Sequence, residues 1–84
     1  MEAMCRDIIG KTIVSEETGR KFGLVGNLNF IVESGELLNL VLEAPTKAIE
    51  QINLETDDSG RFLIPFSTVK SVGDFIIVSE KEII

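Results

Sequence analysis

The sequence predicts an all-β fold, a small barrel of five to six short strands with at most one short helix. Three observations predict it. Apolar and polar residues alternate with a period of two over much of the chain. Glycine, proline and acidic turn residues separate the short apolar runs. The chain has 84 residues, a length that suits one hydrophobic core. We therefore expect residues 1–84 to form a single domain.

The first half of the chain predicts three antiparallel strands. The first expected strand covers 12–15 and ends at the polar turn 16–19. The second covers 24–32, and the third covers 36–43 after the turn residues 33–35, so that these two strands form a hairpin. The alternation places one set of residues inward: Leu24, Leu28, Phe30, Val32, Leu38, Leu40 and Leu42.

The third strand is expected to end at Pro45, because proline has no amide hydrogen to donate to a neighbouring strand. Thr46 follows, and threonine is a favourable N-cap residue. We therefore expect a short helical turn over 46–53, which contains Ala48, Ile49 and Ile52.

The stretch 60–78, GRFLIPFSTVKSVGDFIIV, predicts the last strands. A short strand over 62–64 stops at Pro65, and the final strand covers 75–78. Tight turns are expected at 67–69 and at Gly73-Asp74. A small barrel has to redirect the chain between strands to close its sheet, so Pro65 and Gly73 are expected at corners or edges.

The composition disfavours several functions. The net charge is −6 and the eight basic residues are scattered, which argues against nucleic-acid binding. The chain has no histidine, the commonest general base and zinc ligand, and only one cysteine, so no intramolecular disulfide can form. We find no apolar run long enough to cross a bilayer and no secretory leader pattern, and we expect a cytoplasmic protein without direct membrane insertion.

Two local patterns suggest ligand sites but fail on inspection. The acidic loop 55–60 places oxygen-bearing side chains before Gly60 as a calcium loop does, yet Phe66 occupies the position of the bidentate glutamate. Gly19, Gly23 and Gly26 resemble a phosphate cradle, but no helix start or Lys-Ser pair follows them. Glycines inside a strand pattern more often mark a bulge or a close approach of two backbones. We predict no catalytic residue, metal site or cofactor.

A second apolar face is expected on the outside of the barrel. Several apolar residues alternate with those placed inward, and the apolar end of the chain adds two more. Either a terminal segment covers this face or a protein partner does, and large apolar patches mark interaction surfaces. A homodimer is the simplest such partner. The candidate interface residues are Val25, Ile31, Leu37, Val41, Leu63, Ile76, Val78, Ile83 and Ile84.

Several short segments match a known family pattern: IGK at 9–11, Gly19, FGLV at 22–25, LIPF at 63–66, Val69 and VGDFIIV at 72–78. Through them the chain resembles the PRC-barrel family, named for the photosynthetic reaction centre, from about residue 6 to residue 79. One departure is Asn27, where the family often has aspartate.

The resemblance implies a β-barrel that binds proteins rather than an enzyme. In length the chain is similar to stand-alone archaeal members of the family, some of which act as adaptors in cell division, linked to the FtsZ ring and its SepF anchor. We therefore expect such an adaptor, with a SepF-like protein or another PRC-barrel division protein as partner, and with a homodimer or a heterodimer with a paralogue as its assembly. The alternative is a ribosome-maturation or RNA-associated module, because the maturation factor RimM contains the same barrel. The acidic charge argues against this alternative.

Overall fold

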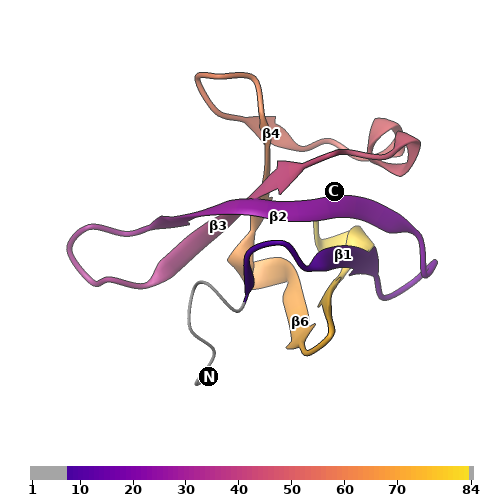
Figure 1. Ribbon diagram of the computed structural model, residues 1–84, viewed down its shortest axis with the longest axis horizontal. Coiled ribbons are helices and arrows are strands. Elements are labelled where there is room, and N and C mark those ends of the chain that lie inside the picture. The colour runs from indigo at the N-terminus through magenta and orange to yellow at the C-terminus, as the bar shows by residue number, and fades with distance from the viewer. Residues whose placement is uncertain (1–7, 84) are drawn as a thin grey trace.

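The computed structural model describes residues 8–83, so Cys5 and Ile84 lie outside the described residues. Strands predominate, and the predicted all-β fold is confirmed (Figure 1). The elements are β1 (Thr12–Ser15), β2 (Lys21–Phe30), β3 (Leu37–Glu43), η1 (Lys47–Gln51), β4 (Glu55–Thr56), β5 (Phe62–Pro65), η2 (Phe66–Thr68), β6 (Val69–Val72), β7 (Phe75–Val78) and α2 (Glu80–Ile83), where η denotes a 3₁₀ helix.

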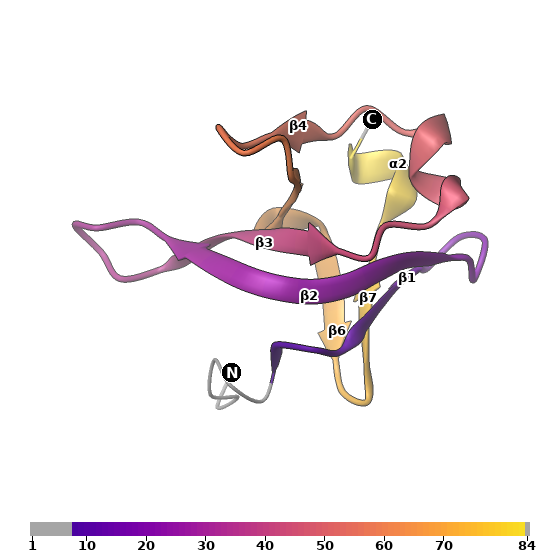
Figure 2. The ribbon, with the colours of Figure 1, turned by 45° about the horizontal axis from the view of Figure 1, so that its top comes forward.

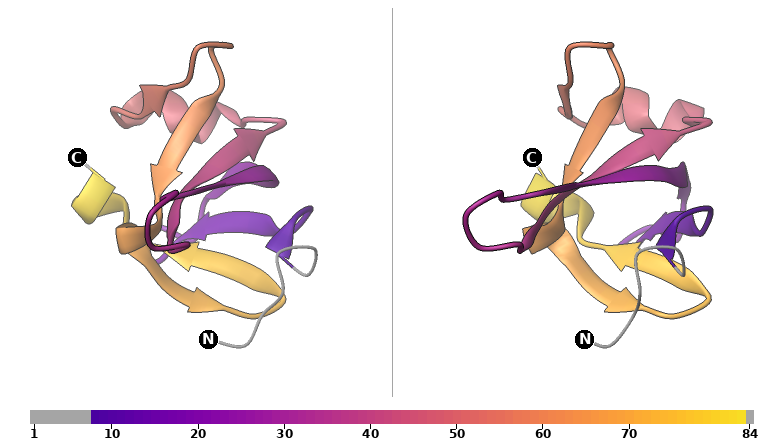
Figure 3. Two further views of the ribbon diagram at one scale, coloured as in Figure 1. Left: turned by 90° about the vertical axis from the view of Figure 1, so that its left-hand side faces the viewer. Right: turned by 60° about the vertical axis from the view of Figure 1, so that its left-hand side comes forward.

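The described strands form one sheet in the order β4-β5-β3-β2-β1-β7-β6. Its seven strands exceed the expected five to six, because 69–72 is a strand and the two-residue β4 adds another. All neighbours are antiparallel except β1 and β7, which pair in parallel and join the two ends of the chain. In Figure 3 the sheet curves from the orange β5 to the yellow β7. The buried apolar side chains of its strands form one core cluster.

Two glycines in β2 mark a bulge and a close approach of β2 to β3. The register of β2 against β3 shifts between Val25 and Asn27, which marks a bulge at Gly26. A bulge inserts one residue, so Val25 and Leu28 both point into the core although they are three residues apart. At Gly23 an added Cβ would lie 2.8 Å from the carbonyl oxygen of Glu43. The expectation of a bulge and a close backbone approach is confirmed.

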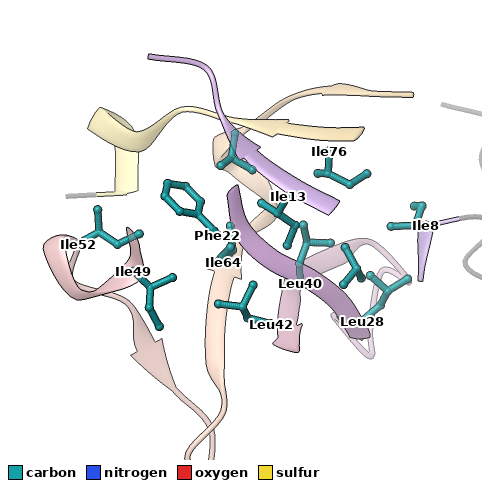
Figure 4. Packing of buried hydrophobic residues seen from close by; sticks show 12 residues of the cluster. Ile8, Ile13, Phe22, Leu28, Leu40, Leu42, Ile49, Ile52, Ile64 and Ile76 are labelled. Atoms are coloured by element: carbon teal, nitrogen blue, oxygen red, sulfur yellow. The ribbon is translucent and has the colours of Figure 1, made fainter. Parts of the chain in front are cut away.

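Four residues that the sequence analysis expected on the outside of the barrel are buried. Val25 and Val78 are completely buried, while Val41 and Ile76 expose at most 2%. Alternation gave the wrong face in β2 because of the bulge. In β3 the consecutive residues Leu40, Val41 and Leu42 are all buried, so both faces of the strand are covered. In β7 the face with Ile76 and Val78 lies in the core, while Phe75 on the other face is exposed. Figure 4 shows Ile13, Phe22, Leu28, Leu40, Leu42, Ile64 and Ile76 within this core.

The chain turns a corner at Pro65, as expected. Pro65 ends β5, which pairs with β3, and it precedes η2, which leads into β6 on the other end of the sheet. The buried Thr68 hydroxyl donates to the Pro65 carbonyl at 2.7 Å, and the Thr68 carbonyl accepts from the Ser79 amide at 2.8 Å. Gly73 lies in the bend between β6 and β7. The corner residues thus redirect the chain from one end of the sheet to the other.

The helical turn expected over 46–53 is η1. The Thr46 hydroxyl accepts a hydrogen bond from the Ala48 amide at 3.3 Å, which confirms its role as N-cap. The Thr46 amide also donates to the Phe22 carbonyl at 2.9 Å, so the start of η1 is fixed to β2. Ile49 and Ile52 pack into the core from this turn (Figure 4).

The short helix α2 is held by the turn between β1 and β2. The Glu17 carboxylate accepts from the Glu80 amide at 2.7 Å and from the Ser79 hydroxyl at 2.8 Å. Lys70 of β6 forms an ion pair with Glu82 at the other end of α2. Partial desolvation opposes ionisation of Glu17, but the hydrogen bonds from Ser79 and Glu80 outweigh it and lower the pKa of this carboxyl.

The lowered pKa of Glu17 predicts a pH-dependent stability. A carboxyl whose pKa is lower in the folded state stabilises the fold above its unfolded value, here 4.5, and loses that contribution as the pH falls through the folded value. Urea midpoints of the wild type should therefore decrease below about pH 4.5. Glu17→Gln should lower the midpoint at pH 7 and flatten this decrease. Equal slopes for the two proteins would contradict the prediction.

Candidate interaction surface

The end of the β2–β3 hairpin projects from the sheet, at the left in Figures 1 and 2. Strand β1 pairs with β2 only as far as Leu24, and β5 pairs with β3 only over 39–41. The hairpin beyond these pairs is therefore two-stranded. Its turn is closed by hydrogen bonds between Ile31 and Glu36 at 2.8 Å and between Gly35 and Ile31 at 2.7 Å, as the turn residues predicted.

Large apolar side chains are exposed at this end of the hairpin. Val32 exposes 95% of its surface, Leu38 exposes 48% and Phe30 exposes 45%. Ile31 between them is half-buried. We call these four residues the hairpin surface. Phe30, Val32 and Leu38 had been expected inside, but the strands extend beyond the part of the sheet that encloses the core.

The side chain of Asn27 binds the backbone of β2 in the hairpin. The Leu28 amide donates to the Asn27 side-chain oxygen at 2.8 Å. An aspartate could accept the same bond, so the departure from the family at Asn27 leaves this local geometry intact. The side chains of the hairpin surface are exposed and can contact a partner.

The other sequence-predicted interface residues lie elsewhere. Leu37 and Ile83 are half-buried and pack against the core, and Leu63 of β5 is half-buried beside Ile83. Ile83 therefore covers part of the sheet from within the chain. Of the candidates, only Ile31 belongs to the hairpin surface. Alternation alone missed Phe30, Val32 and Leu38, although their position beside the turn 33–35 was a usable signal.

The comparison with family models gives a match over nearly the whole chain: the PRC-barrel domain model covers residues 1–83. This chain belongs to the PRC-barrel family. PRC-barrel domains are protein-interaction modules and are in general non-catalytic. The comparison with curated proteins finds no match to the chain.

The acidic loop of this PRC-barrel domain binds its own backbone. Asp57 accepts from the Ser59 and Arg61 amides, both at 2.9 Å, and pairs with the Arg61 guanidinium at 3.1 Å. The hydrogen bond from the Arg61 amide is the main reason why the pKa of Asp57 is lowered. The carboxylate is thus used to close the turn. Residues 8–83 contain no group of three potential metal ligands.

Several basic side chains of the PRC-barrel domain already have acidic or carbonyl partners. Arg20 pairs with Glu80 at 3.5 Å, Arg61 pairs with Asp57 and Lys70 pairs with Glu82. These ion pairs use three of the basic residues of an acidic domain. Among the described residues, no helix is both long and apolar enough to pass through a membrane.

Proposed function

We propose that this PRC-barrel domain is a non-enzymatic adaptor that acts in archaeal cell division together with FtsZ and a SepF-like partner. The observation that supports an adaptor is the hairpin surface, where three large apolar residues are exposed on a projecting hairpin. The division assignment comes from the resemblance to stand-alone archaeal members of the family. In this proposal the domain is cytoplasmic and reaches the division site through its partners.

The hairpin surface also supports self-association as a homodimer, or a heterodimer with a paralogue. Residues 26–32, GNLNFIV, contain no charged side chain, so their apolar residues can be buried in a contact without burying a charge of this segment. An interface of standard size buries about 800 Å² per partner. The described chain has 5282 Å² of accessible surface, so a patch of that size is about 15% of it. A two-fold contact would use the same hairpin in both copies.

Val32→Asp is expected to convert the dimer to a monomer and leave the thermal unfolding midpoint nearly unchanged, because Val32 is 95% exposed. Light scattering and sedimentation at several concentrations measure the change. Ser34→Asp is the matched control, since it adds the same charge to the neighbouring turn without removing an apolar side chain. A wild type that is monomeric at high concentration would refute self-association.

The cellular role is tested by tagging and depleting the protein in its native host. We expect recruitment to the division site, co-purification of FtsZ or a SepF-like protein, and enlarged cells on depletion. Diffuse localisation with normal cell size and no division partner would refute the role in division. Salt-sensitive, sub-micromolar binding to ribosomal RNA would instead support the ribosome-maturation alternative, which the net charge of −6 argues against.

A further inference from the structure

An apolar groove lies between η1 and the strands β4 and β5, away from the hairpin surface. It has a volume of about 450 Å³, within the range of ligand-binding clefts. Its apolar lining comes from η1, from the segment that follows it and from β5: Ile49, Ile52, Leu54 and Phe62. Figure 2 shows η1 and β4 on the same side of the molecule, joined by a short segment. A second hollow continues past Ile49 and Phe62 toward Pro45.

The rim of the groove is acidic. Glu50 and Glu55 both line it and both are exposed. Neither carboxylate forms an ion pair with any residue in the part of the chain that the structure describes. They therefore add unpaired negative charge beside an apolar floor, which favours a basic ligand with an apolar side chain.

Strand β4, whose Glu55 lines the groove, also offers an open backbone edge. It is the outermost strand of the sheet and pairs only with β5 among the described residues. The Asp57 amide donates to the Arg61 carbonyl at 2.9 Å, so it points toward β5. Because backbone groups alternate in direction along an antiparallel strand, the Thr56 amide and carbonyl point away from β5. The hydrogen bonds found for side chains and loops do not use them. An extended peptide could pair with this edge.

We propose that this groove docks an extended, basic peptide segment of another protein, which pairs with the edge of β4 and inserts one apolar side chain between Ile49, Ile52 and Phe62. The proposal builds on the adaptor function, because an adaptor that self-associates through its hairpin needs a separate site for its client. A second copy of this chain is a poorer occupant than a basic peptide, because the chain has a net charge of −6 and the rim of the groove is acidic.

Synthetic peptides test the proposal on the full chain by two-dimensional NMR. The probe is acetyl-Lys-Thr-Val-Leu-Val-Thr-Lys-amide, and its control has glutamate in place of both lysines. We expect the basic peptide to shift the amide signals of Leu54, Glu55 and Thr56 with a Kd below about 1 mM, and to weaken as salt is added. The acidic peptide should cause no shifts. Absence of shifts at Leu54 to Thr56, or equal binding of both peptides, would overturn the proposal.

Two variants separate the backbone contribution from the charge contribution. Thr56→Pro removes the outward amide hydrogen at an edge position where proline is tolerated, and should weaken binding about ten-fold. The pair Glu50→Lys and Glu55→Lys should weaken it by a similar factor, whereas Glu33→Lys and Glu36→Lys, the same charge change on the hairpin, should leave it within about two-fold. Unchanged affinity of Thr56→Pro and of the Glu50 and Glu55 pair would overturn the groove as the site.

The hairpin variant Val32→Asp distinguishes this proposal from the proposed self-association. It should bind the basic peptide as the wild type does, because Val32 lies on the hairpin and does not line the groove. Loss of peptide binding in this variant would place the peptide on the hairpin and overturn the groove. Dimerisation measured by light scattering in the same samples reports on the proposed self-association independently.

Discussion

Gly23→Ala is expected to destabilise the domain by about 3 kcal/mol or more. The new Cβ would lie 2.8 Å from the Glu43 carbonyl oxygen and 2.8 Å from a methyl carbon of Leu42, and the backbone atoms of β3 cannot move away without breaking the sheet. The φ of Gly23 is +149°, a conformation that residues with a side chain rarely adopt. Both effects act in the same direction, and both act on the folded state.

Thermal unfolding measures this loss, since about 1 kcal/mol corresponds to about 4–8 °C in a domain of this size. Gly19→Ala is the control. Gly19 also has a positive φ, +72°, but an added Cβ would meet no atom within 4 Å. This variant should lose only about 1–2 kcal/mol, the cost of the backbone conformation alone. Equal losses for the two variants would show that β2 and β3 do not approach closely at Gly23.

Ile76→Asp is expected to abolish cooperative folding. Ile76 exposes 1% of its surface in the core, opposite Ile13 in the parallel pair of β1 and β7. Aspartate would lose the packing of a large aliphatic side chain, about 2–5 kcal/mol, and would also bury a carboxylate without a partner. The domain is small, so its total stability is expected near the lower end of about 5–15 kcal/mol. Far-UV circular dichroism at 25 °C should show an unfolded chain.

The neighbouring residue provides the matched control for Ile76→Asp. Phe75 lies on the same strand but exposes 49% of its surface, because successive side chains of a strand point to opposite faces. Phe75→Asp should cost about 1 kcal/mol and leave the domain folded. A folded Ile76→Asp together with an unfolded Phe75→Asp would mean that β7 presents its other face to the core.

The local features of the fold were predictable because they depend on neighbouring residues. Thr46 caps η1 with its own hydroxyl, and Gly35 closes the hairpin with a positive φ. Pro65 ends β5 because it has no amide hydrogen. Each of these residues acts within a few positions of itself, so its chemistry can be predicted from a short window of sequence.

The interior and the interaction surface were predicted less well. Alternation predicts two faces for a strand but not which of them is enclosed, and a bulge such as the one at Gly26 reverses the pattern within one strand. Val25 was expected outside but lies in the core. Val32 was expected inside but is the most exposed of the large apolar residues that the structure describes. The groove at Ile49 and Phe62 was not predicted, because its walls come from η1 and β5.

The sequence by itself determined the all-β class, the positions of the turns and the net negative charge, since composition, period-two alternation and glycine or proline chemistry are local properties. Only the tertiary structure decided that β1 pairs in parallel with β7, that Glu17 holds α2, and that the hairpin extends beyond the core. These features join residues about 60 positions apart or depend on where a neighbouring strand stops. No local pattern encodes such a distance, because the free energy that selects these contacts is gained only when the whole sheet assembles.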